Sequence, residues 1–98
     1  MPEARIIIGI DAGTSVIKAV AFQTDGRQLA VSSVVNRYQQ GAGGAVTQSL
    51  QQTWKDCAAA LRGLGDQLPG LAARVLAISV TAQGDGTWLV GKGNRAVG

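Results

Sequence analysis

The feature that most constrains this fold is a β-branched run near the N-terminus that ends in an acidic turn. Residues 6–10 read IIIGI and are followed at once by Asp11, Ala12 and Gly13. Such a run predicts a central strand that feeds a tight turn. Residues 16–23 form a second β-rich segment with largely apolar positions on both faces. A strand of that kind is expected to be covered on both sides.

A hairpin signal joins the second segment to a third. Residues 24–27 contain the pair Asp25-Gly26. This pair favours a two-residue hairpin turn, because glycine accepts a positive φ without steric cost. Residues 28–35 then supply the next strand. This part of the chain therefore predicts a three-stranded antiparallel meander.

An amphipathic helix is predicted after a glycine-rich loop at 41–44. Its apolar residues recur every three or four positions and are Val46, Leu50, Trp54, Cys57, Ala58 and Leu61. Ser49 is placed to cap the N-terminus of the helix, with Gln52 in a capping-box relation to it. Gly63 and Gly65 are expected to end the helix in left-handed conformations. The apolar face should carry its tryptophan and cysteine into the core.

The rest of the chain predicts one more strand in the sheet and a small hairpin. Residues 75–81 read VLAISVT, which indicates a fourth strand that pairs parallel to the first. Residues 87–90 and a return at 96–97 flank a turn rich in glycine, which indicates a terminal hairpin. One helix can cover only one sheet face, so an apolar face should favour self-association or packing against missing segments. The chain ends at Gly98 immediately after the return strand begins, so we expect a fragment.

Composition excludes several classes of function. The basic residues are scattered and few aromatic residues accompany them, so no nucleic-acid partner is expected. Cys57 is the only cysteine and histidine is absent, which excludes an intrachain disulfide, His-dependent triads and the usual zinc sites. The chain has neither a signal-peptide pattern nor a stretch long enough to span a membrane. We therefore expect a cytoplasmic protein without a membrane partner.

The turn after the first strand carries groups suited to phosphate and metal binding. A carboxylate at a strand end, here Asp11, can hold Mg²⁺ directly or through water. Gly13 lets the backbone approach a phosphate, and the amides and hydroxyls of Thr14 and Ser15 can donate hydrogen bonds to it. Lys18 would add a positive charge nearby. The same residues also suit a purely structural turn in which the carboxylate caps free amides, and chemistry alone leaves both interpretations open.

Three stretches of the sequence resemble one known family. Residues 8–19, IGIDAGTSVIKA, resemble the first phosphate motif of the FGGY carbohydrate kinases, which belong to the actin-like ATPase superfamily. Residues 46–49 are similar to the Glu-Gln-Asp start of that family's helix, with Ser49 in place of the Asp cap. Residues 75–89 resemble its strand and loop that introduce the sugar. The resemblance implies an α/β fold of the ribonuclease H-like type, present in part: meander, helix, parallel fourth strand and terminal hairpin.

The resemblance also implies an ATP-dependent sugar or polyol kinase and assigns roles to the turn. By position, Asp11 would lie near Mg²⁺, with water between them. The residues implied to contact the terminal phosphates of ATP are Gly13, Thr14 and Ser15, with Lys18 as a supporting charge. ATP, Mg²⁺ and a small polyhydroxylated substrate are therefore the expected ligands.

A second set of residues is implied to bind the sugar. Gln83, Gly84 and Asp85 correspond to the positions where family members touch substrate hydroxyls. A carboxylate accepts two hydroxyl hydrogen bonds well, although a Gly-Asp-Gly turn needs no ligand to explain it. The loop resembles that of polyol and ketopentose kinases, such as those for erythritol or L-xylulose, more than that of glycerol kinase.

The same resemblance limits what the chain can do by itself. The family's general-base aspartate and adenine pocket lie beyond residue 98. Residues 1–98 would then be the N-terminal part of the first, sugar- and phosphate-binding domain of a two-domain kinase. Phosphoryl transfer depends on positioning and charge neutralisation in a closed cleft, so no turnover is expected from this segment alone.

Two other functions share such a turn. A nuclease of the ribonuclease H-like fold, such as a Holliday-junction resolvase, also ends its first strand in an aspartate, but it needs converging carboxylates for two metals. The aspartates after the first hairpin are Asp56, Asp66 and Asp85. A non-catalytic actin-like or sugar-sensing regulator would share the phosphate loop, and a DNA-binding extension would identify it.

Overall fold

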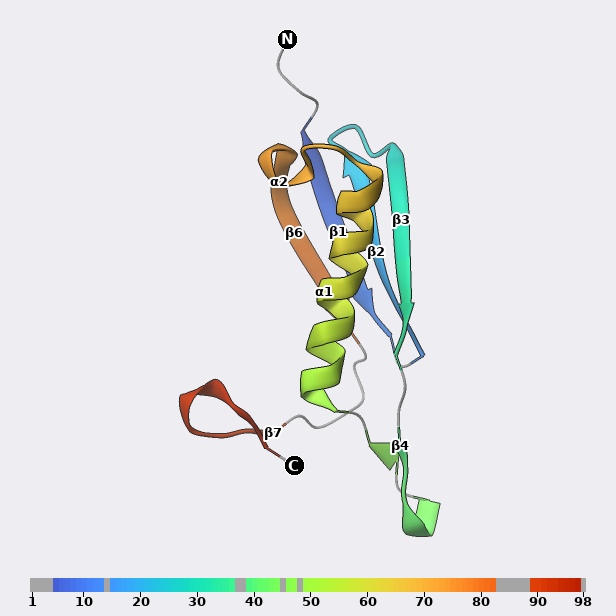
Figure 1. The fold of residues 1–98 in the computed structure, drawn as a ribbon, viewed down its shortest axis with the longest axis vertical. Coiled ribbons are helices and arrows are strands. Elements are labelled where there is room, and N and C mark those ends of the chain that lie inside the picture. Colours follow the sequence, from blue (N-terminus) through green and yellow to red (C-terminus); the bar gives the residue numbers. More distant parts are fainter. Residues whose placement is uncertain are drawn as a thin grey trace.

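The chain forms a four-stranded mixed sheet with one long helix on one face (Figure 1). The computed structural model describes residues 5–13, 15–36, 39–44, 46–47, 49–82 and 89–97. The strands of the sheet are β1 (Ile6–Ala12), β2 (Val16–Gln23), β3 (Gln28–Val35) and β6 (Val75–Ala82), in the order β3-β2-β1-β6. β2 runs antiparallel to β1 and to β3, whereas β6 runs parallel to β1. The predicted meander and parallel fourth strand are thus confirmed.

The core lies between this sheet and helix α1 (Leu50–Gln67), which lies over β2 and β3 (Figure 1). Its buried residues are Ile6, Ile8, Ile10, Ile17, Ala19, Ala21, Ala30, Ala60 and Leu64. The isoleucines of β1 alternate with exposed or half-buried residues, as side chains of a strand must. The small buried side chains of Ala19 and Ala21 on β2 leave room for the helix to approach closely.

Shorter elements complete the described chain. α2 (Leu71–Arg74) precedes β6. A small hairpin pairs two strands of two residues each, β4 (Gln39–Gln40) and β5 (Val46–Thr47), on either side of the 3-10 turn η1 (Ala42–Gly44). The terminal hairpin pairs β7 (Leu89–Val90) with β8 (Ala96–Val97) around η2 (Lys92–Asn94). The terminal hairpin was predicted, whereas Val46 was expected on the helix and lies in β5 instead.

The turn between β2 and β3 has three residues rather than the predicted two. Gln23 N donates to Arg27 O at 2.8 Å, and Gly26 N donates to Gln23 O at 2.9 Å, so the loop consists of residues 24–26. Gly26 has a φ of 94°, whereas Asp25 is not in the left-handed region. A two-residue type I′ turn would need a positive φ at both central residues, which only glycine accepts readily.

The predicted end of α1 at Gly63 or Gly65 is wrong, because the helix continues to Gln67. Ser49 caps the N-terminus as expected, accepting a hydrogen bond from Gln52 N at 3.1 Å. The C-terminus falls at Leu68, which is extended at φ −123° and ψ 99°. Pro69 follows it, and the helical region is sterically disfavoured for a residue before proline.

The expectation that Trp54 belongs to the core is also wrong, since 76% of its surface is exposed. The buried positions of α1 are Ala60 and Leu64, and the half-buried Cys57 lies on the same stripe. Successive residues of a helix are rotated by about 100° around its axis, so a side chain one position before or after a narrow buried stripe points away from it. Trp54 is therefore adjacent to the packed face but not part of it.

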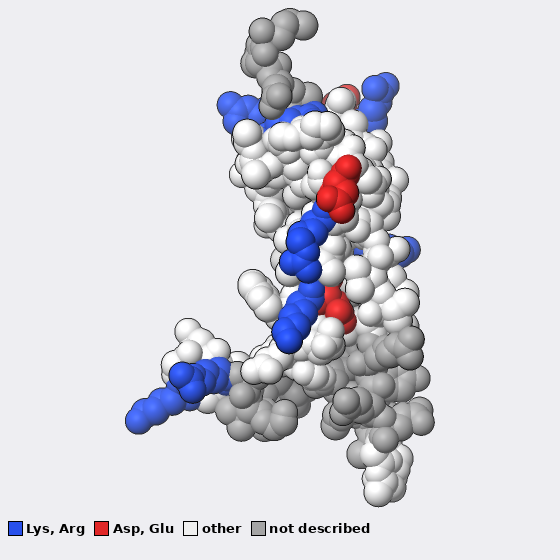
Figure 2. All heavy atoms as spheres, in the orientation of Figure 1, with Lys and Arg blue, Asp and Glu red and all other residues white. Residues whose placement is uncertain are grey.

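Large apolar side chains remain exposed on the rest of the sheet. On β6 they are Leu76, Ile78 and Val80, and elsewhere in the sheet they are Ile7, Val16, Val31 and Val35. The single helix thus covers only part of one sheet face, as expected. On the α1 side of the molecule, basic and acidic side chains are interspersed along the helix (Figure 2). No helix within the described residues is long and apolar enough to cross a membrane.

Candidate phosphate and metal site

A row of polar side chains crosses the sheet one residue before the turn that joins β1 to β2. Asp11 of β1 is the register partner of Lys18 of β2 and of Thr81 of β6. Lys18 is in turn the partner of Ser33 on β3. Residues at the same register in adjacent strands project from the same face. Thr81, Asp11, Lys18 and Ser33 thus lie side by side across the sheet, and we call them the polar row.

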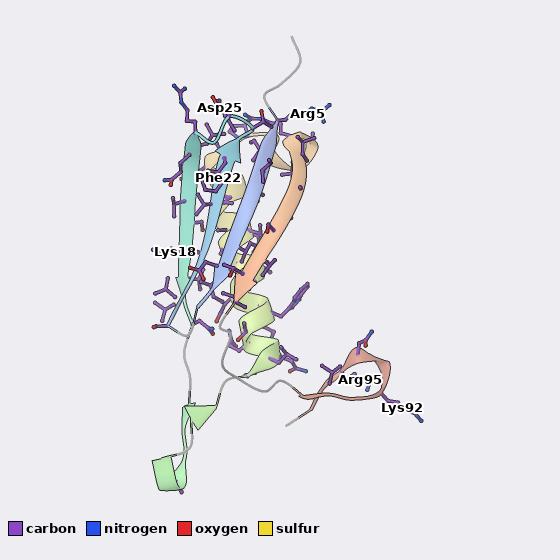
Figure 3. All side chains as sticks on the ribbon, turned by 180° about the vertical axis from the view of Figure 1, so that it is seen from behind. Arg5, Lys18, Phe22, Asp25, Lys92 and Arg95 are labelled. Carbon is purple, nitrogen blue, oxygen red and sulfur yellow. The ribbon has the colours of Figure 1, made fainter. Side chains whose placement is uncertain are left out.

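The polar row lies on the sheet face opposite to α1. Ile10, which precedes Asp11, is buried toward the helix, whereas Asp11, Lys18 and Thr81 are all exposed. Figure 3 views the molecule from the side opposite to Figure 1, so that this face is in front, with Lys18 near the turn and Phe22 farther along β2. The predicted pair of Asp11 and Lys18 is thus brought together on an open surface. Thr81, which was not among the predicted site residues, adds a hydroxyl beside the carboxylate of Asp11.

The turn between β1 and β2 is tight at Gly13. A Cβ atom added to Gly13 would lie 2.9 Å from Val16 O, so any larger residue would force the backbone to shift. Ser15 is exposed next to it, and Thr14 lies outside the described residues. A turn without a side chain at this point lets a ligand approach the backbone amides.

Asn36, just after β3, is a contributor to this site that the sequence analysis missed. Only 2% of its surface is exposed. Its Nδ2 donates to Gly13 O at 3.2 Å, and its backbone N donates to Ser15 O at 2.8 Å. The residue is therefore tied to the turn on both sides of position 14. A buried asparagine directly after a strand is a weak signal in sequence, because asparagine there usually marks a turn.

The sugar-binding residues expected from the resemblance, Gln83, Gly84 and Asp85, lie outside the described residues. β6 ends at Ala82, which is the register partner of Ala12 at the end of β1. The chain therefore leaves β6 at the same edge of the sheet as the β1–β2 turn. In sheets with parallel strands, ligands bind at the carboxyl ends of those strands.

The donor set of this edge suits a weakly coordinated, hydrated cation. Among the residues the structure describes, no group of three or more His, Cys, Asp or Glu side chains comes together. Asp11 therefore belongs to no such cluster within the described ranges, and Asp56 on α1 accepts a hydrogen bond from Gln52 Nε2 at 2.9 Å. Mg²⁺ keeps several waters and is held by one or two carboxylates together with substrate phosphates. The residues present thus fit Mg²⁺ bound with a nucleotide, and those that the structure describes form no cluster of carboxylates for two metals.

Comparison with known proteins identifies the family. Residues 6–98 match the N-terminal domain of the FGGY family of carbohydrate kinases. Over 93 residues the chain is 70% identical to an erythritol kinase from Brucella abortus (strain 2308), which covers 95% of this chain and 18% of that protein. The chain belongs to the FGGY family of carbohydrate kinases. Its sequence is similar to that of an erythritol kinase in particular.

Solved structures of sugar kinases share the fold. The chain superposes on a xylulose kinase from Rhodospirillum rubrum with a TM-score of 0.86 and 22% identity, covering 95% of this chain and 19% of that one. A gluconate kinase from Lactobacillus acidophilus gives a TM-score of 0.86 and 21% identity, covering 98% and 19% of the two chains. The expected partial actin-like ATPase fold is thereby confirmed. The chain spans about a fifth of the length of these relatives.

Proposed function

We propose that the whole protein is a kinase that transfers the terminal phosphoryl group of ATP to a hydroxyl of a small polyol, with erythritol as the first candidate. The observation that carries this proposal is the polar row beside the tight turn at Gly13, in a chain of an established carbohydrate-kinase family. The 70% identity to an erythritol kinase supports the choice of substrate. The alternatives of a nuclease or a non-catalytic regulator have no comparable support.

The β1–β2 turn would bind the phosphates of ATP. Gly13 leaves the backbone accessible, and the amides and hydroxyls of Thr14 and Ser15 would donate hydrogen bonds to phosphate oxygens. Lys18, exposed on the polar row, would add a positive charge on the same side. Such groups fix the position of the transferred phosphoryl group and stabilise the charge that spreads over its oxygens.

Asp11 would orient the hydrated cation that accompanies the nucleotide. Its carboxylate is exposed and lies between a cation and a hydroxyl in the polar row, Lys18 and Thr81. Mg²⁺, when bound, neutralises charge on the phosphate oxygens. Asp11 would accept hydrogen bonds from the water of that ion, and Thr81 would fix the side-chain orientation of Asp11 from the neighbouring strand.

The sugar and the proton-accepting base would be supplied from elsewhere in the protein. Gln83, Gly84 and Asp85 are proposed to contact substrate hydroxyls, on the basis of the resemblance. The general base and the adenine pocket are proposed to lie beyond residue 98. Residues 1–98 would then be the first part of the phosphate- and sugar-binding domain, and by themselves they would give no turnover.

The proposed setting is the cytoplasm, with no nucleic acid or membrane as partner. A lone half-buried cysteine suits a reducing compartment without structural disulfides. The partners proposed for the exposed apolar strands are the remainder of the enzyme or a second copy of the chain.

Thermal-shift screening of the full-length protein tests this function. A panel of erythritol, other tetritols and pentitols, xylulose, gluconate and glycerol would be scanned with a non-hydrolysable ATP analogue and Mg²⁺. A true substrate raises the unfolding temperature by mass action, and we expect erythritol to give the largest shift. ATP-dependent phosphorylation of the best ligand must follow. Absence of both a shift and turnover with every compound would refute the proposal.

A further inference from the structure

We propose that Asn36 is a positioning residue of the phosphate-binding turn, which holds the turn in its ligand-ready shape without touching the nucleotide. This inference rests on the proposed function of the β1–β2 turn. It adds a residue from the end of β3, which lies two strands away from β1 in the sheet.

The first argument is the pair of hydrogen bonds that Asn36 makes. Its side-chain Nδ2 donates to Gly13 O, and its backbone N donates to Ser15 O. These two bonds hold Gly13 and Ser15, the described residues on either side of position 14, from one residue. A turn whose amides must converge on a phosphate needs such a support, because donors that reorient on binding lose part of their effect.

The second argument is what the amide leaves unsatisfied. Asn36 Oδ1 is buried and has no hydrogen-bond partner among the described residues. A buried acceptor without a donor opposes folding. An apolar side chain of the same shape would avoid that penalty, so stability alone does not account for an asparagine here. Violations of the packing rules of this kind are expected at functional sites.

The third argument is that the orientation of the amide is determined by the turn. Exchanging Oδ1 and Nδ2 would place two oxygens against each other at Gly13 O, where the donor now lies at 3.2 Å. The amide has no other partner among the described side chains to fix its orientation. Its contact with the turn is therefore the specific interaction that the asparagine provides.

Two substitutions separate this role from simple packing. Asn36→Leu keeps the approximate shape of the side chain but removes both polar atoms. Asn36→Ala also removes the donor and, unlike an aspartate, adds no negative charge beside the phosphates. The matched control is Gln67→Ala, because Gln67 Nε2 likewise donates to a backbone carbonyl, Val31 O in the middle of β3 at 2.9 Å, away from the β1–β2 turn.

The experiment is calorimetric titration of the full-length protein and these variants with an ATP analogue and Mg²⁺, alongside thermal unfolding. For both Asn36 variants we expect Kd for the nucleotide to rise about tenfold. Affinity losses of this size are typical when a residue that orients the binding groups, without touching the ligand, is removed. The leucine variant should not unfold at a lower temperature than wild type, and the Gln67→Ala control should keep the wild-type Kd.

The outcomes distinguish this inference from the proposed function. If the wild-type protein binds the nucleotide and every folded Asn36 variant binds within twofold of it, Asn36 has no positioning role and the function still stands. If the leucine variant alone folds poorly, the alanine variant still decides by its Kd. If the wild type binds no nucleotide, the proposed function and this inference both fail.

Discussion

Asp11 and Lys18 are direct cross-strand partners in the β1–β2 hairpin, one pair before its last, and both side chains are exposed on the face away from α1. The hairpin thus presents a carboxylate and an ammonium group side by side at the base of the turn. A phosphate with its hydrated cation carries charges that complement both groups. This placement follows from strand alternation alone, because Ile10 and Ile17 on the neighbouring positions are buried in the core.

Replacing the carboxylate should reduce catalysis without unfolding the protein. In the full-length enzyme, Asp11→Asn should lower kcat/KM for ATP by about a hundredfold or more, because groups aimed at transition-state charge contribute on that scale. Steady-state kinetics with Mg²⁺ in excess would measure this. The control is Asp25→Asn in the β2–β3 turn, an exposed aspartate whose Oδ1 accepts a hydrogen bond from Arg27 N at 2.9 Å. Equal effects of the two substitutions would argue against a role for Asp11.

Two glycines of α1 should respond in opposite ways to alanine. A Cβ on Gly63 would overlap Ser32 Oγ of β3, whereas a Cβ on Gly65 meets nothing within 4 Å. Gly65→Ala should stabilise by about 0.5–1 kcal/mol through helix propensity, and Gly63→Ala should destabilise by about 1–3 kcal/mol through overpacking. Thermal unfolding of the pair would check this. A gain of stability in Gly63→Ala would mean that the helix and strand do not pack as closely as described.

The thiol of Cys57 should react slowly at neutral pH. Burial raises the pKa of Cys57, and the charge of neighbouring Asp56 raises it further. A raised pKa keeps the folded thiol protonated, so its contribution to stability is present below the pKa of the unfolded thiol and is lost as pH rises through the folded value. Alkylation by iodoacetamide should therefore be slower than in the denatured protein, and Asp56→Asn should accelerate it. Rates equal to those of the denatured protein would contradict this.

The isolated 98-residue chain should self-associate. Apolar side chains on β6 and on the sheet face away from α1 are exposed, and Val35 and Val80 each expose more than 60% of their surface. Contiguous exposed apolar surface drives association. Light scattering at rising concentration would show an increase in mean mass. Val80→Lys, on the exposed strand β6, should shift the distribution toward monomer, and a monodisperse wild-type monomer would contradict the prediction.

The sheet could be predicted from sequence because its signals are local. The isoleucines of β1, the alternating residues of β2 and the Asp25-Gly26 pair each define an element within a few residues. The bounds of β2 and β3 agree with the prediction at both ends. The position of Asp11 and Lys18 on one face follows from the same alternation.

The errors came from packing that a single sequence does not contain. Glycine is typical of helix ends, but Gly63 lies inside α1, where its lack of a side chain lets the helix pack closely against Ser32 of β3. Trp54 lies one residue away from the buried stripe, which depends on how the helix sits on the sheet. Asn36 became part of the site only when β3 brought it beside a turn that lies 23 residues earlier. Contacts between distant segments are what sequence periodicity cannot predict.

The most direct test of the account is the Mg²⁺ dependence of ATP binding by the full-length protein. Titration calorimetry would compare the wild type with Asp11→Asn, each with Mg²⁺ and with EDTA, using a non-hydrolysable analogue. We predict that Mg²⁺ tightens nucleotide binding about tenfold or more in the wild type, and that most of this gain disappears in the variant. A wild-type protein with no affinity for ATP and Mg²⁺, or a variant with an unchanged Mg²⁺ dependence, would contradict the assignment of the β1–β2 turn.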